Sequence, residues 1–351
     1  MSRIERIEIK QYRGLKNIEL KNLSHINVLV GENNSGKTSV LEAIQLLSNP
    51  FSESLLFNVT LRRMRSALIE SNSQMGEILK WIFPQGCEGH LPIVLKLQHD
   101  DMQTSVSFEL FKQDFVDIDM LMKSKEALFT INSGMPIKTE LEIQVKVGDL
   151  EKTLVMSKKF PVENKSENHL FKATNIIHGD VFRMISAEQV GAVILDQKKD
   201  ELIEILKQFD NVITGIEIIP FLKSNQIYLQ KNNKELIPLS SFGDGLQKVV
   251  YIASKLLNLK DDTLLLDDAE VSIHTKMMPI FFKWLSKLAL KHNVIIFMTT
   301  HSLEVVDGVL AANKESLESL SFYRLKNEKV KYFRGQDVYE LRTQFGQDMR
   351  G

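Results

Sequence analysis

The segment GENNSGKTSV, residues Gly31 to Val40, decides the fold class of this chain. It follows the apolar run INVLV at residues 26–30 and precedes LEAIQLL at residues 41–47, whose apolar residues recur at roughly helical spacing. From Gly31 to Thr38 it matches the pattern G-x-x-x-x-G-K-[ST], which cradles phosphate when a strand precedes it and a helix follows. The sequence therefore predicts a phosphate-binding loop between a buried strand and a helix.

The residue types in this loop suit a nucleotide that carries Mg²⁺. Glycines let the backbone curl so that successive N–H groups face the β-phosphate, Lys37 bridges β- and γ-phosphate oxygens, and Thr38 offers a hydroxyl to the metal. We predict that Lys37 also acts in catalysis. The loop residues expected to contact the nucleotide are Gly31, Asn33, Asn34, Ser35, Gly36, Lys37, Thr38 and Ser39.

The segment TLLLDDAE, residues 263–270, is an apolar strand that ends in carboxylates. An acidic pair at such a position is often only a solvated strand end, but the upstream phosphate loop favours a metal site. We predict that Asp267 holds the Mg²⁺ shell and that Asp268 orients the attacking water. Glu270 is the nearest alternative for the second role.

His301 follows the apolar run NVIIFMTT at residues 293–300 and belongs to the polar cluster TTHS. A single histidine at a strand end is commonly a loop residue. A polar cluster at the carboxyl edge of a parallel sheet, however, is where ligands bind, so we predict that His301 senses the γ-phosphate.

The segment SSFGDGLQ, residues 240–247, opens a helix with two glycines and hydroxyl groups. This composition is typical of an anion site at a helix N-terminus, although a capped helix with glycine spacing would look the same. One chain has no obvious use for two phosphate-binding loops around one nucleotide.

Composition and charge exclude several other classes of protein. The chain has 351 residues, 43% of them hydrophobic, and a formal net charge of −1, so no global field attracts nucleic acid or an acidic membrane. The single cysteine, Cys87, excludes an intramolecular disulfide framework, and the eight histidines show no zinc-site spacing. We find no signal peptide and no apolar run that could span a bilayer, so we expect a cytoplasmic protein without membrane contact.

The order of patterns along the chain predicts an α/β fold with an insertion. Residues 1–49 and 172–351 combine the phosphate loop with alternating helices and buried strands, and we assign them to a nucleotide-binding core. Residues 50–171 contain helical candidates and runs such as TELEIQVKVGDLEKTLVMSKK, with a turn at Gly148 and Asp149. We expect this part to form an inserted antiparallel and helical lobe.

Together these motifs resemble the ABC-type P-loop ATPases of the RecF, chromosome-maintenance and OLD (overcoming lysogenisation defect) groups. The resemblance implies a mixed or parallel core sheet with helices on both faces, ATP and Mg²⁺ as ligands, and a dimer in which the signature loop of one subunit closes on the γ-phosphate held by the other. Ser241, Gly243 and Asp244 match that signature, LLLDDAEVSIH resembles the extended OLD-type motif that ends in His274, and TTHS matches the histidine switch. Arg13 resembles a basic residue that approaches the nucleotide, and Gln189 in ISAEQ matches the family's metal-contacting glutamine.

Two departures from the family pattern affect the expected function. The family usually has Glu where this chain has Asp268, and the shorter side chain places its carboxylate farther from the water, so we expect slow hydrolysis. The nuclease domain of OLD proteins has no counterpart in this sequence, so we expect a separate effector.

The function that we predict is an OLD-like ATPase that forms a homodimer, or a higher homo-oligomer, on ATP and controls a separate nuclease or toxin in anti-phage defence. The alternative is a RecF-like clamp that closes on duplex DNA. The basic stretches at residues 61–66 and 231–234 favour this alternative. A small-molecule kinase would leave the signature loop and His301 unexplained.

Overall fold

The computed structural model describes residues 4–61, 79–86, 89–100, 102–116, 137–156, 169–174, 176–177, 185–221, 224–232 and 234–350. The chain divides into two compact units. The first contains Met1–Arg6, Glu19–Gln45 and Phe171–Gly351, and the second contains Ile7–Ile18 and Leu46–Leu170. The second unit therefore takes in residues 7–18, which the sequence analysis assigned to the core.

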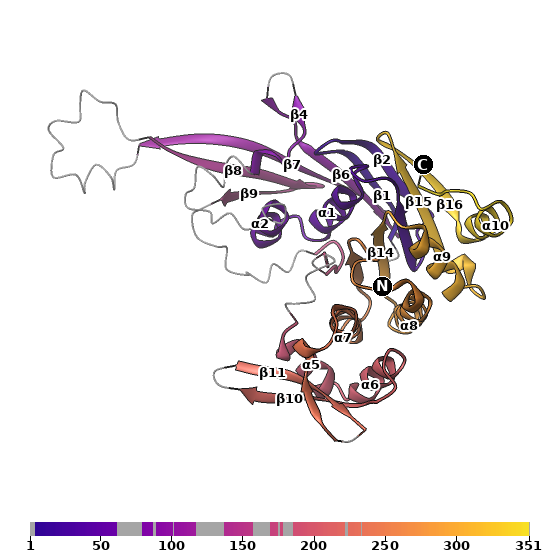
Figure 1. Ribbon diagram of the computed structural model, residues 1–351. Helices are drawn as coiled ribbons and strands as arrows, with labels where there is room; N and C mark the ends of the chain where they lie inside the picture. Colours follow the sequence, from indigo (N-terminus) through magenta and orange to yellow (C-terminus); the bar gives the residue numbers. More distant parts are fainter. Residues whose placement is uncertain are drawn as a thin grey trace, which may run out of the picture. The chain divides into compact units, whose positions relative to one another are not determined.

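The first unit is built around a five-stranded sheet of order β13-β14-β3-β15-β16. Figure 1 labels three of these strands, β14, β15 and β16. The first four strands in this order run parallel, and β16 pairs antiparallel with β15. All residues of β3 and β13 are buried, including the polar Asn27 and Thr263, as the largely apolar sequences of these strands predict. The strands are β3 (Ile26–Val30), β13 (Thr263–Leu266), β14 (Ile295–Thr300), β15 (Leu320–Lys326) and β16 (Lys329–Arg334).

This topology positions the candidate site. Because β3, β13 and β14 are adjacent and parallel, the loops that follow them emerge at the same edge of the sheet. These are the loops that carry the phosphate-loop motif, the acidic pair and His301.

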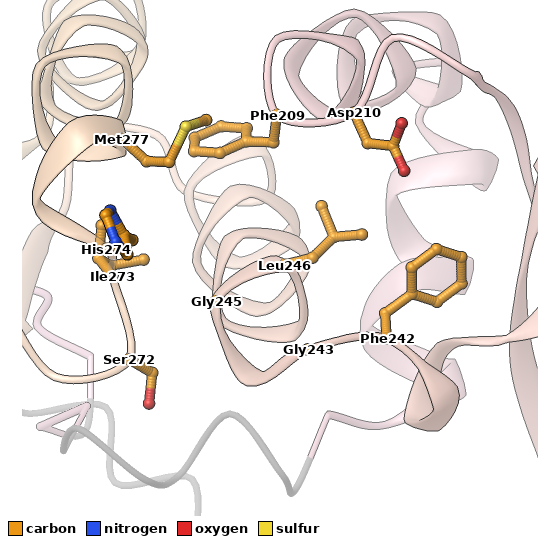
Figure 2. Close-up of a pocket in the computed structure, with 10 residues that line it drawn as sticks. All are labelled: Phe209, Asp210, Phe242, Gly243, Gly245, Leu246, Ser272, Ile273, His274 and Met277. Carbon is orange, nitrogen blue, oxygen red and sulfur yellow. The ribbon is translucent and has the colours of Figure 1, made fainter.

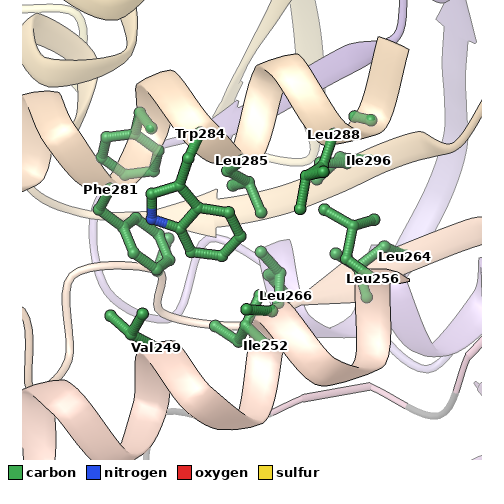
Figure 3. Close-up of a cluster of buried hydrophobic side chains, with 14 of the residues drawn as sticks. Val249, Ile252, Leu256, Leu264, Leu266, Phe281, Trp284, Leu285, Leu288 and Ile296 are labelled. Carbon is green, nitrogen blue, oxygen red and sulfur yellow. The ribbon is translucent and has the colours of Figure 1, made fainter. Parts of the chain in front are cut away.

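Helices pack on this sheet through one apolar core. Figure 3 shows side chains of α7 and α8, among them Ile252, Trp284 and Leu285, against Leu266 of β13 and Ile296 of β14. The helix that the segment SSFGDGLQ was predicted to open is present as α7. The helices are α1 (Lys37–Ser48), α5 (Ala187–Leu195), α6 (Lys199–Lys207), α7 (Asp244–Leu257), α8 (Met278–Lys291), α9 (Leu303–Ala312) and α10 (Gly335–Phe345), with 3₁₀ turns η3 (Leu239–Ser241), η4 (Thr275–Met277) and η5 (Leu317–Ser319).

A smaller antiparallel sheet of order β10-β11-β12 completes the first unit. It packs against α5 and α6, as Figure 1 shows. Its strands are β10 (Ile213–Phe221), β11 (Ser224–Lys231) and β12 (Leu236–Pro238). No helix among the described residues is long and apolar enough to cross a membrane.

In the second unit, the strands β6 to β9 form an antiparallel meander. Its sheet has the order β2-β1-β6-β7-β8-β9, and the predicted turn between the last two strands is present, with Gly148 at φ +57°. The elements are β1 (Ile4–Tyr12), β2 (Leu15–Lys21), α2 (Glu53–Leu61), β4 (Gln85–Gly86), β5 (Gly89–His90), β6 (Ile93–His99), β7 (Met102–Val116), β8 (Ile137–Val147) and β9 (Leu150–Met156). The basic stretch at residues 61–66 lies outside the described residues after Leu61.

Candidate nucleotide-binding site

The phosphate loop joins β3 to α1, as predicted, and its curvature depends on glycine. Gly36 has φ +95°, a backbone angle that residues with a side chain rarely adopt. At Gly31 an added Cβ would lie 2.5 Å from the carbonyl oxygen of Leu325 on β15, so the loop passes too close to the sheet for a side chain. The N-terminus of α1 follows directly, and the N–H groups of its first turn and the helix dipole favour an anion at this position.

Lys37 lies inside the loop rather than in solvent. Its ammonium donates to the carbonyl oxygens of Gly31 at 2.8 Å and Glu32 at 2.7 Å, and the side chain is almost fully buried. Burial lowers the pKa of Lys37, and the carboxylates of Asp268, Glu270 and Asp267 partly oppose this effect. The loop therefore holds a cation close to the position where phosphate binds in loops of this kind.

Thr38 meets the first carboxylate of the acidic pair. Its hydroxyl donates to Asp267 Oδ1 at 3.0 Å, and the hydroxyl of Thr299 on β14 donates to the same oxygen at 2.7 Å. Thr299 in turn accepts the backbone N–H of Asp268 at 2.8 Å. Mg²⁺ prefers oxygen ligands, so the hydroxyl and carboxylate oxygens gathered here suit the ion. Thr299, which the sequence analysis treated only as part of TTHS, fixes the orientation of Asp267.

A second cluster contains Asp268, Glu270 and His301, whose ligand atoms all lie within 4.8 Å of one another. Glu270 accepts the backbone N–H of His301 at 3.0 Å, and its Oε1 lies 2.9 Å from the ring nitrogen Nδ1. Asp268 lies farther from that nitrogen, at 3.8 Å. Burial, together with the neighbouring carboxylates of Asp267 and Glu270, raises the pKa of Asp268.

Glu270 is the less exposed of the two carboxylates that flank His301. Its side chain is 12% exposed, against 47% for Asp268. Oε2 of Glu270 is buried and has no hydrogen-bond partner among the described residues, so one oxygen of this carboxylate has an unused acceptor site. The structure thus brings together Lys37, Thr38, Asp267, Asp268 and His301, and it adds Glu270 as a full member of the group.

The signature residues are organised differently. Ser241 ends η3, Gly243 is the N-cap of α7 without a side-chain cap hydrogen bond, and Asp244 begins the helix; all three are exposed. The start of α7 packs tightly on the loop that follows the acidic pair, because a Cβ on Gly245 would lie 2.8 Å from the carbonyl oxygen of Ser272. Figure 2 shows the pocket of about 420 Å³ beside this contact, into which Phe242, Leu246 and His274 project.

Lys248 connects the signature helix to the acidic loop, although no motif in the sequence marks it. Its buried ammonium donates to the carbonyl oxygens of Ala269 at 3.1 Å and Val271 at 2.6 Å. Burial lowers the pKa of Lys248 to about 8, although Glu270 and Asp268 oppose this effect. The signature helix is therefore bonded to the backbone on both sides of Glu270.

Two predicted site residues have other partners. Gln189 lies in the first turn of α5, and its amide nitrogen donates to Tyr251 O at 2.7 Å and Ser254 Oγ at 2.6 Å, both on α7. The amide nitrogen is therefore turned to α7, and the structure does not bring it to Thr38 and Asp267. Arg13 belongs to the second unit, where its guanidinium donates to Tyr12 Oη at 3.1 Å and Trp81 O at 3.3 Å, so its predicted role stays a prediction.

Comparisons with known families identify the chain. A family model described as AAA ATPase domain matches residues 3–189, more than half of the chain. The chain belongs to this AAA ATPase family. A second AAA-domain model, whose description also mentions the AbiEii toxin of a type IV toxin–antitoxin system, matches residues 152–307.

Individual relatives of this AAA ATPase point the same way. An ATP/GTP phosphatase of Helicobacter pylori is 25% identical over 99% of this chain and 96% of its own length. The DNA replication and repair protein RecF of Nitrosococcus oceani is 51% identical over 47 residues, 13% of each protein. The family and the ATP/GTP phosphatase support ATPase activity in general.

A solved structure shows which fold this is. The Smc head bound to the C-terminal winged-helix domain of ScpA has a TM-score of 0.50 and 13% identity, over 94% of this chain and 97% of its own. At that identity the likeness concerns the fold alone. The chain has the α/β P-loop fold of ABC-type ATPases, which confirms the fold class predicted from its motifs.

Proposed function

We propose that this AAA ATPase binds ATP and Mg²⁺ at the phosphate loop, hydrolyses ATP, closes as a homodimer on the nucleotide and thereby controls a separate effector protein. The observation that carries the hydrolytic part is the hydrogen-bond network of Thr38, Asp267 and Thr299. This network supports the proposal because it holds oxygen ligands for Mg²⁺ next to the phosphate loop. The N–H groups of that loop and Lys37 suit the phosphates of the nucleotide.

Each group has a role in an in-line displacement. Lys37 would neutralise charge on the β- and γ-phosphate oxygens, and Thr38 and Asp267 would hold Mg²⁺. The metal, when bound, draws charge from the phosphate oxygens. Asp268 orients the attacking water, with Glu270 as the alternative because its Oε2 has an unused acceptor site. His301, whose Nδ1 lies 2.9 Å from Glu270 Oε1, would donate a hydrogen bond to the terminal phosphate.

A direct experiment compares ATP turnover of the wild type in Mg²⁺ and in EDTA with that of Asp267→Asn. We expect turnover that depends on Mg²⁺ in the wild type, and a loss of about a hundredfold or more in the variant, because the amide is a neutral and weaker ligand. Asp200→Asn, an exposed carboxylate in the first turn of α6, is the matched control. Equal turnover of Asp267→Asn and wild type would reject the site.

The dimer part rests on the exposed signature residues. Ser241 and Gly243 stand at the N-terminus of a 14-residue helix, where phosphate is favoured, and the chain has a separate phosphate loop of its own. A nucleotide held by a second copy would place its phosphate at this helix N-terminus. Analytical ultracentrifugation with ATP should then show a dimer, and with ADP a monomer; the same mass with both nucleotides would contradict this part.

The control of an effector in anti-phage defence rests on the resemblance to OLD proteins and on the toxin–antitoxin description of the second family model. The RecF similarity keeps the DNA clamp as a second candidate. A plaque assay with cells that carry this chain and its neighbouring genes, beside a filter-binding assay on duplex DNA with ATP, separates the two. Phage protection without DNA binding favours effector control, and ATP-dependent DNA binding without protection favours the clamp.

A further inference from the structure

Residues 346–350, which follow α10, are held firmly within the first unit. Gly346 ends α10 in the left-handed region at φ +59°, and the N–H of Gln347 donates to Leu341 O at 3.1 Å. Arg342 donates to Gln347 O at 2.8 Å, and Met349 is 2% exposed within the main apolar core. The backbone at residue 350 is therefore fixed by packing on its N-terminal side.

This anchoring places Arg350 at the candidate nucleotide site. Its guanidinium donates to the backbone oxygen of His301 at 3.5 Å. Arg350 lines a pocket of about 260 Å³ together with Glu32 and Asn33 of the phosphate loop, His301 and Asp348. The phosphate loop, His301 and Arg350 therefore line the same pocket.

The guanidinium is held in a geometry that also suits phosphate. Nε lies 3.0 Å from Asp348 Oδ1 and Nη2 lies 2.7 Å from Oδ2, so two parallel N–H groups meet two oxygens. Phosphate accepts the same paired donors. The side chains of this ion pair are partly exposed, 39% for Arg350 and 49% for Asp348. An exposed ion pair contributes little free energy, so Arg350 loses little when a phosphate replaces the carboxylate of Asp348.

The charges around the site favour such an exchange. The cluster described above contains the carboxylates of Asp268 and Glu270, and Asp267 lies next to it in sequence. Lys37 lies on the inner side of the loop. A triphosphate adds several negative charges, and an arginine on the open side would offset part of the repulsion.

We propose that Arg350 binds the terminal phosphate of the nucleotide held by its own chain, and that Asp348 holds the guanidinium in place before the nucleotide binds. The proposal rests on the phosphate-loop site proposed above and adds a phosphate-binding residue from a segment outside the recognised motifs. Arg350 distinguishes nucleoside triphosphate from diphosphate, because it contacts only the third phosphate.

The test is a comparison of ATP and ADP affinities by calorimetry, with Mg²⁺, for the wild type, Arg350→Gln and Arg350→Lys. For Arg350→Gln we expect ATP affinity to fall about ten- to hundredfold while ADP affinity stays within about twofold, because a hydrogen bond to a charged group is lost only with ATP. Arg350→Lys should lose less ATP affinity than Arg350→Gln, because lysine keeps the positive charge but lacks the paired donors of arginine.

Arg334→Gln is the matched control, since Arg334 forms a similar exposed pair with Asp337 at the start of α10. It should leave both affinities unchanged, and thermal melting should show that the variants fold. If Arg350→Gln lowers ATP and ADP affinity equally, changes neither, or strengthens ATP binding, the proposal is wrong. If the wild type binds neither ATP nor ADP, the proposed nucleotide site at the phosphate loop is wrong. This result differs from the three outcomes that reject only the role of Arg350.

Discussion

Two glycine-containing loops lead into helices in the first unit, and they differ in how complete their surroundings are. At the phosphate loop, Lys37 is buried and Thr38 is bonded to Asp267, so the groups that suit phosphate and metal are already held by the same chain. At the signature loop, Ser241 and Gly243 are exposed, and α7 begins without a side-chain cap. The contrast suggests that the first loop binds its nucleotide alone and that the second needs a ligand from outside the chain.

The largest expected effect comes from removing the buried cation of the complete loop. Lys37→Ala should abolish measurable ATP binding while the fold stays intact, because the variant loses the point charge that faces the phosphates. Isothermal calorimetry measures the affinity, and circular dichroism checks the fold. If the ATP affinity of Lys37→Ala equals that of the wild type, the phosphate loop does not bind the nucleotide.

The corresponding change in the exposed loop should separate binding from turnover. Ser241→Arg should leave ATP binding within about twofold but reduce hydrolysis by about a hundredfold or more, because the bulky cation blocks the approach of a second subunit's nucleotide. Nucleotide affinity and steady-state turnover are measured on the same protein. A loss of affinity as large as that of Lys37→Ala would mean that both loops belong to one site in one chain.

Within the complete site, the roles of the two carboxylates can be told apart. Asp268→Asn should stop hydrolysis and keep nucleotide binding, with a loss of about 10²–10⁴ in kcat, and Asp268→Glu is expected to raise the rate because the carboxylate regains its reach. Glu270→Gln, which removes the partner of His301, serves as the comparison. If only Glu270→Gln affects turnover, Glu270 is the residue that orients the water.

The smallest expected effect concerns Lys248, which links the two loops through the acidic segment. Its pKa falls from 10.5 in the unfolded chain to about 8 in the folded one, so between these values the unfolded chain binds more protons and stability rises with pH. The free energy of unfolding, measured in urea, should rise between pH 8 and 10 in the wild type more steeply than in Lys248→Met. Equal slopes would show that Lys248 stays charged when the protein folds.

The sequence predicts the parts of this site that lie in contiguous motifs. The phosphate loop, the acidic pair and TTHS each combine a buried strand with ligand groups at its end, so their meeting at one sheet edge follows from parallel pairing. The roles of Thr299, Lys248 and Arg350 depend on contacts between distant segments; Arg350 and His301 are 49 positions apart. No local pattern marks such contacts.

The Gln189 prediction shows the reverse problem. A glutamine in the segment ISAEQ matches the family's position in sequence, but Ser186 accepts the N–H of Gln189 and begins a helix there, which directs the amide toward α7. A motif with one decisive residue therefore carries less structural information than the phosphate loop, in which glycine spacing, lysine and threonine must all agree.

The most direct test of the central claim mixes two variants that are each inactive, Lys37→Ala and Ser241→Arg. A hetero-dimer of these chains contains one interface with an intact phosphate loop and an intact signature loop, so the shared-site account predicts that ATPase activity returns, to about half of the wild-type value per hetero-dimer. Hetero-dimer formation is confirmed with two different affinity tags. If hetero-dimers are present and their ATPase activity does not exceed that of either variant alone, the nucleotide site is contained in one chain and the account is contradicted.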